Sequence, residues 1–143
     1  MLNFLVHLVT TLTVAGIMWF IQVVHYPLLR YVGQASFVTY EKAHTRLAIG
    51  LVVSLMVIES ATGVLLLRWR PAGVTGGQVA IGLVLLGIIW VSTMLLQVPQ
   101  HHRLASGFSE KAHRILVESN WIRTACYTAR AFLLSWMVFG AVH

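Results

Sequence analysis

Four long apolar stretches constrain the fold of this chain more than any other feature. They cover residues 4–24, 47–67, 78–98 and 124–142, and about 20 apolar residues suffice for an α-helix to cross the hydrocarbon core of a bilayer. Of the 143 residues, 58% are hydrophobic, 10% are charged and none is aspartate. A soluble fold of this size could not bury so much apolar surface. The sequence therefore predicts an all-α integral membrane four-helix bundle that occupies the whole chain as one domain.

The basic residues fall mainly in alternate connections between the predicted spans. Only Arg68 and Arg70 lie between the second and third spans. Seven follow the first and third spans: Arg30, Lys42, Arg46, Arg103, Lys111, Arg114 and Arg123. The positive-inside rule then places the first and third connections in the cytoplasm and both termini outside it. The net charge of +6 is thus explained by membrane topology, and we expect the lipid bilayer, not nucleic acid, as the partner.

The first apolar stretch has no lysine or arginine before it and no Ala-x-Ala-like cleavage site after it. We therefore expect it to be kept as the first helix of the bundle.

An internal repeat links the two long connections. The string Glu-Lys-Ala-His occurs at 41–44 and again at 110–113. A Gln-Val pair followed by histidine precedes each string, at Gln22 and His25 and again at Gln97 and His101. This order predicts two related helical hairpins, an arrangement known among membrane proteins. Both strings are then expected at the same, cytoplasmic, end of the bundle.

Histidine and glutamate side chains at that end predict a metal site. In Glu41-x-x-His44 and Glu110-x-x-His113 the two side chains project from one helix face, and this pair is half of the ligand set of di-iron carboxylate bundles. Too few carboxylates remain for the full set, so a histidine-dominated site is expected. Its predicted metal ligands are His25, His44, His101, His102 and His113. Glu41 and Glu110 are the predicted catalytic groups, which orient ligands or move protons, and a redox role favours copper or iron over zinc.

Haem is the alternative cofactor, because membrane bundles can hold it between two histidines while arginines meet its propionates. Arg123 and Arg130 are the candidates for that cofactor-binding role. A third interpretation needs no cofactor: the same histidines and glutamates would form interfacial hydrogen bonds and ion pairs with nearby lysines and arginines.

Charged residues inside the spans predict a second polar feature. Glu59 and Arg130 lie at depths that a long arginine side chain can bridge, so we expect a buried ion pair. With His7 and Gln22, this pair could instead form an ion or proton pathway. Tyr26 and Trp121 lie near the predicted span ends and are expected to be interface anchors.

Three strings carry a resemblance to a known family: residues 19–27 (WFIQVVHYP), 40–44 (YEKAH) and 120–123 (NWIR). They resemble strings of small bacterial four-helix membrane proteins. In size, helix count and interfacial histidines the chain also resembles anthrone-oxygenase-like membrane proteins. This resemblance implies an oxygen- or redox-dependent reaction on an apolar substrate, and a location in the bacterial inner (cytoplasmic) membrane. It assigns no catalytic residue.

The sequence thus favours a metal-dependent oxidoreductase or oxygenase that acts on a hydrophobic small molecule. Two alternatives stay open: a haem b-binding electron-transfer protein, and a non-catalytic transporter or accessory subunit, which could assemble as a homo-oligomer. Glycine-rich nucleotide loops, the nucleophile elbow and the His-Glu-x-x-His motif do not occur, so nucleotide chemistry and the commonest hydrolase mechanisms have no support.

Overall fold

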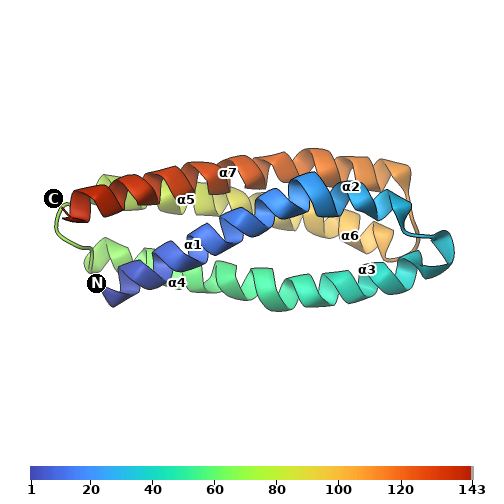
Figure 1. Ribbon diagram of the computed structural model, residues 1–143, viewed down its shortest axis with the longest axis horizontal. Helices are drawn as coiled ribbons and strands as arrows, with labels where there is room; N and C mark the ends of the chain where they lie inside the picture. The colour runs from blue at the N-terminus through green and yellow to red at the C-terminus, as the bar shows by residue number, and fades with distance from the viewer. Residues whose placement is uncertain (143) are drawn as a thin grey trace.

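The computed structural model describes residues 1–142, which form four long helical spans (Figure 1). The predicted all-α four-helix bundle is confirmed. The first to fourth spans, each long and apolar enough to cross a membrane, are Leu2–Tyr31, Gln34–Arg68, Gly76–Leu104 and Glu110–Val142. Their segments in chain order are α1 (Leu2–Phe20), η1 (Ile21–His25), α2 (Tyr26–Leu28), η2 (Leu29–Tyr31), α3 (Gln34–Ala48), η3 (Ile49–Val53), α4 (Ser54–Arg68), α5 (Gly76–Ser92), η4 (Thr93–Gln97), α6 (Val98–Leu104) and α7 (Glu110–Val142).

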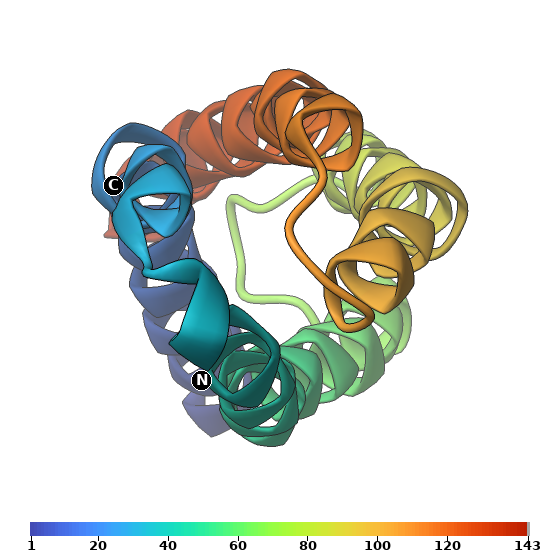
Figure 2. The same cartoon turned by 90° about the vertical axis from the view of Figure 1, so that its right-hand side faces the viewer.

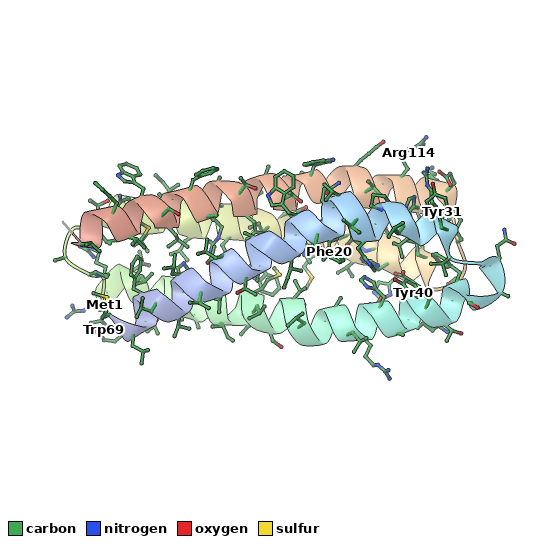
Figure 3. The ribbon with its side chains drawn as sticks, in the orientation of Figure 1. Met1, Phe20, Tyr31, Tyr40, Trp69 and Arg114 are labelled. Atoms are coloured by element: carbon green, nitrogen blue, oxygen red, sulfur yellow. The ribbon has the colours of Figure 1, made fainter. Side chains whose placement is uncertain are left out.

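Each span neighbours the spans before and after it in the sequence. α1 packs beside α4 and α7, and α5 packs beside α7 and α4. Figure 2 shows the four spans as a ring viewed from one end. The start of α1, the end of α7 and the 69–75 loop lie at one end of the bundle, which we call the terminal end. The 32–33 and 105–109 loops lie at the other, which we call the site end. Figure 3 labels Met1 and Trp69 toward the former and Tyr31 toward the latter.

The spans extend beyond the predicted apolar stretches, mostly toward the site end. The second span begins at Gln34 rather than residue 47, and the fourth begins at Glu110 rather than residue 124. These extensions are too polar for a hydropathy criterion to detect. Each nevertheless buries an apolar anchor, since Phe37 is 1% exposed and Leu116 is fully buried. Packing of such residues stabilises the helix beyond the apolar stretch.

Large apolar side chains cover the outer surface of the bundle. Phe132 is 73% exposed, Leu47 and Leu95 are each 68% exposed, and Trp136 is 64% exposed. A contiguous apolar surface of this kind is unfavourable in water, whereas α-helices satisfy their own backbone polar groups in lipid. The outer surface indicates a lipid environment and a multi-pass membrane protein.

The short loop at the terminal end is held by a glycine. Gly73 has φ +80°, and a Cβ atom there would lie 1.9 Å from the carbonyl oxygen of Gly140 near the end of α7. Only glycine combines this backbone conformation with so close an approach. Thr75 then begins α5 with a capping box that it shares with Gln78. The two hairpins are therefore locked together at the terminal end.

Three of the spans contain a five-residue π-helical segment: η1, η3 and η4. Two of these segments have a proline two residues after their last residue, Pro27 after η1 and Pro99 after η4. A proline ring clashes with the carbonyl four residues earlier, which lies inside the π-helical segment in both cases, and the wider turn relieves the clash. π-helical turns change the direction of the side chains around them and are frequent at functional sites.

Candidate functional site

Histidine and glutamate side chains from three spans gather inside the site end. His25 ends η1, Glu41 and His44 lie in α3, and His101 lies in α6. The rings of His25 and His44 stack with centroids 4.4 Å apart, and those of His44 and His101 are 5.5 Å apart. The predicted clustering of these four residues is thus observed, and we call them the histidine cluster.

A chain of hydrogen bonds runs through one side of the cluster. The Oε1 atom of Glu41 lies 2.5 Å from Nδ1 of His101, and Nε2 of His101 lies 3.1 Å from the hydroxyl of Tyr26. Because the carboxylate can only accept, Nδ1 carries the proton, and Nε2 of a neutral ring then accepts from Tyr26. Glu41 is fully buried and Tyr26 is 2% exposed. This arrangement fixes the orientation of the imidazole and lets a proton move along the chain Glu41–His101–Tyr26.

Tyr26 is a site residue that the sequence prediction placed elsewhere. We expected it to anchor the membrane interface, but it is buried inside the bundle. The π-helical turn of η1 directly before it directs its ring inward, beside His101. Trp121, by contrast, is 48% exposed and packs edge-on against Trp19, as an outward-facing aromatic would. The sequence signal that could have indicated this inward placement was the position of Tyr26 between His25 and Pro27.

Several buried polar atoms at the site end have no hydrogen-bond partner. They include Nε2 of His25, Oε2 of Glu41 and Nε of Arg123. Buried polar groups in native proteins are nearly always paired, so an unpaired one calls for an explanation. Three such atoms near one another mark this part of the bundle as different from a fully satisfied core.

Arg123 of α7 is the charged residue of this group. It is 6% exposed, and its guanidinium lies close to the side chain of Tyr26. The ion pairs among residues 1–142 are Arg30–Glu110, His101–Glu41 and Arg130–Glu59, so no carboxylate compensates Arg123 in the described chain. This positive charge therefore lies inside the bundle without a negative partner.

A cavity of about 470 Å³ lies beside the histidine cluster, between the second and third spans. His44, His101 and Tyr26 border it, and its other residues are apolar, basic or, at Thr45, Thr93 and Gln97, polar and uncharged. The apolar set lies nearer the middle of the bundle and includes Ile21, Ile49, Val52, Val53, Met56 and Val98. The basic set consists of Lys42, Arg46, His102 and Arg123. Ile49 and His102 are exposed, so the cavity opens sideways between the two spans.

The described chain contains no ready metal site. Among residues 1–142, no three histidine, cysteine, aspartate or glutamate side chains are arranged so that they could hold a metal ion. The geometry explains why: both ring nitrogens of His101 already have partners, and His25 and His44 stack instead of pointing at a common centre. The cluster does not fit a metal in this arrangement.

The second Glu-x-x-His string does not join the cluster. Glu110 is 69% exposed in its side chain and pairs with Arg30 at 3.4 Å. His113 is buried, and its Nε2 donates to the backbone carbonyl of Tyr26 at 2.7 Å. The predicted convergence of both strings is wrong for this half, because α3 begins seven residues before Glu41 whereas α7 begins at Glu110 itself. Glu110 thus lies at a helix end, outside the bundle interior.

The remaining predicted site residues separate in space. His102 is exposed and borders the mouth of the cavity without entering the ring cluster. Arg123 lies at the site, whereas Arg130 lies seven residues further along α7 in a different buried centre. There its guanidinium lies 2.9 Å from Glu59, and the predicted buried pair is confirmed. Arg130 is therefore not available to bind a cofactor at the histidine cluster.

The Glu59–Arg130 centre is closed by surrounding side chains. Glu59 accepts from Thr11 at 2.6 Å and from Tyr127 at 3.0 Å. Arg130 also donates to Thr11 and to the backbone carbonyl of Gly82. Both oxygens of the carboxylate and both terminal nitrogens of the guanidinium have partners. Nearby, His7 hydrogen-bonds Thr62 at 2.8 Å.

Compared with models of protein families, with curated proteins and with solved structures, the chain shows no match.

Proposed function

We propose that this chain is a membrane-embedded enzyme that acts on a hydrophobic small molecule taken from the lipid. The observation that carries the proposal is the hydrogen-bonded chain Glu41–His101–Tyr26 at the wall of a cavity of about 470 Å³. The volume falls in the range of about 300–1,000 Å³ typical of small-molecule sites. The lateral opening between the second and third spans offers a route from the bilayer.

The chemistry best supported is proton transfer. His101 and Tyr26 border the cavity, so a bound hydroxyl or other acidic group can pass a proton to the Tyr26 hydroxyl while Tyr26 gives its own proton to Nε2 of His101. Glu41 is a positioning residue, because it holds the imidazole by Nδ1 and stabilises the imidazolium that forms. Water is largely excluded around Glu41, so this electrostatic stabilisation is strong.

The oxidoreductase or oxygenase class expected from the sequence is compatible with such a site. Oxidation of phenol-type or hydroquinone-type molecules releases protons and electrons: the histidine base takes a proton, and dioxygen or a bound redox group would take the electrons. A redox metal or haem stays a prediction, and no step above depends on it. Elemental analysis and visible absorption of the protein purified in detergent test that prediction.

The transport alternative has less support. It needs Glu59 and Arg130 to exchange protons or ions, yet each is engaged by partners on neighbouring spans. Replacement of Glu59 should therefore affect folding more than any specific activity.

The test uses the two glutamates of the repeat as a matched pair. Purified protein in nanodiscs is assayed for oxidation of a panel of hydrophobic phenols and hydroquinones in air. Glu41→Gln should lower kcat about a hundredfold or more, Glu41→Asp should restore part of it, and Glu110→Gln should leave it unchanged. The kcat–pH profile of Glu41→Asp should also shift, which a purely structural role would not cause. Equal loss in Glu41→Gln and Glu110→Gln would remove the support for the proposed proton-transfer chain.

A further inference from the structure

The cavity combines basic and apolar linings without an acidic residue. Lys42 and Arg46 come from α3, His102 from α6 and Arg123 from α7, and none of the four glutamates lines the cavity. Lys42, Arg46 and His102 are exposed and can be solvated or screened, but Arg123 is 6% exposed. The electrostatic potential inside the cavity is therefore set largely by a buried guanidinium.

An unpaired guanidinium in this position is costly. Removal of a charge from water costs several kcal/mol or more by order of magnitude unless an opposite charge or several hydrogen bonds replace the water. Arg123 lies beside the neutral side chain of Tyr26, and no carboxylate among residues 1–142 pairs with it. A planar guanidinium is the side chain best suited to hold a carboxylate or a phosphate by two parallel hydrogen bonds.

Arg130, on the same helix, shows how a buried arginine is compensated by the protein's own side chains. Arg130 lies seven residues further along α7, on the same face as Arg123, and it has its own carboxylate partner in Glu59 at 2.9 Å. The cavity beside Arg130 has a volume of about 10 Å³, enough for no more than a single water. The open centre and the closed centre thus differ in both charge balance and free volume.

We infer that the cavity binds an amphipathic anion, with a carboxylate or phosphate head at Arg123 and an apolar chain along Val52, Val53 and Met56. Lys42 and Arg46 attract the head at the mouth of the cavity. The sideways opening at Ile49 lets the chain enter from lipid without leaving an apolar environment. The inference rests on the proposed function, since it names the substrate class of the same cavity.

The experiment measures binding separately from turnover. Protein in phosphatidylcholine nanodiscs is titrated with laurate, dodecyl phosphate, dodecanol and acetate, and binding is followed by native mass spectrometry and by the shift in Tm. Laurate and dodecyl phosphate should bind at least about tenfold more tightly than dodecanol, which lacks the charge, and than acetate, which lacks the chain. The ratio between laurate and dodecyl phosphate identifies which head the site prefers.

Substitutions test where the charged head and the apolar tail of the ligand bind. Arg123→Met should weaken laurate binding about tenfold or more and leave dodecanol binding unchanged. Arg114→Met, an exposed arginine of the same helix, is the matched control and should change neither. Ala48→Trp, which fills the cavity, should weaken the binding of both laurate and dodecanol, and it tests the site by a second route if Arg123→Met fails to fold.

Equal binding of laurate and dodecanol, or full laurate binding by Arg123→Met, would overturn the inference. Tight laurate binding without turnover of any acidic amphiphile would instead contradict the proposed enzyme and leave this inference standing.

Discussion

Arg123 and Arg130 lie two turns apart on one face of α7, yet they differ in charge compensation and in the free volume beside them. Arg130 is held by Glu59, Thr11 and the carbonyl of Gly82, with a void of about 10 Å³ nearby. Arg123 borders a cavity of about 470 Å³. Glu59 balances the charge of Arg130, whereas no carboxylate among residues 1–142 pairs with Arg123. A buried charge with its own partners indicates a role in the fold, whereas one without them indicates a ligand.

The largest effect is expected at the closed centre. Glu59→Gln or Arg130→Gln alone should lower the free energy of unfolding by about 3–5 kcal/mol, because each leaves the other charge buried and unpaired. The double variant should recover part of that loss. Unfolding in mixed micelles with increasing dodecyl sulfate measures the four members of the cycle. Strictly additive losses would show that the two residues do not stabilise each other.

Glycines in the two halves offer a test that involves no charge. A Cβ atom at Gly63 would lie 3.0 Å from Leu83 and 3.2 Å from His7, whereas one at Gly50 has nothing within 4 Å. Gly63→Ala should therefore destabilise the protein by about 1–3 kcal/mol. Gly50→Ala, its matched control in η3, should change stability by less than about 1 kcal/mol. The same unfolding assay applies. A larger loss at Gly50 would contradict the tight terminal half and open site half described above.

Arg123→Met should have a small effect on stability, in contrast to Arg130→Gln. Because the wild-type guanidinium has no carboxylate partner, its removal should change the free energy of unfolding by less than about 1 kcal/mol or raise it. Thermal unfolding in detergent without added anions checks this. A loss as large as that of Arg130→Gln would mean that Arg123 stabilises the fold, and the distinction between the two centres would then disappear.

The smallest effect is expected for the outward ion pair. Arg30 and Glu110 are 50% and 69% exposed in their side chains, and exposed pairs contribute about 0–1 kcal/mol. Glu110→Gln should therefore be nearly silent in the unfolding assay at moderate salt. A clear loss of stability would suggest that Glu110 has a partner inside the bundle after all.

The spans and the Glu59–Arg130 pair could be predicted because they follow from physical requirements that act along the sequence. Apolar stretches of membrane length have to be helices, and a charge in lipid needs an opposite charge. The meeting of His25, Glu41, His44 and His101 followed from the alternating direction of the spans, which places all four at one end. The membrane side that faces the cytoplasm stays a prediction.

Other features depend on details that residue patterns do not contain. Glu41 and Glu110 occupy equivalent places in the repeat, but the point at which each helix begins buries one and exposes the other. Arg123 and Arg130 lie seven residues apart on the same face of one helix, and their different surroundings arise from residues on other spans. Tyr26 turns inward because of a π-helical turn, which is a response to local geometry and to Pro27.

The π-helical segments also make segment length a constrained property at the site. An α-helix turns by about 100° per residue, and a π-helical segment accommodates one residue beyond what α-helical geometry would hold. If η1 returned to α-helical geometry at its present length, for example after Pro27→Ala, His25 and Tyr26 would rotate by about that angle relative to α1. The cluster could then be dismantled without the loss of any histidine or glutamate. The π-helical geometry of η1 is therefore a requirement of the site that is separate from the identity of the residues lining it.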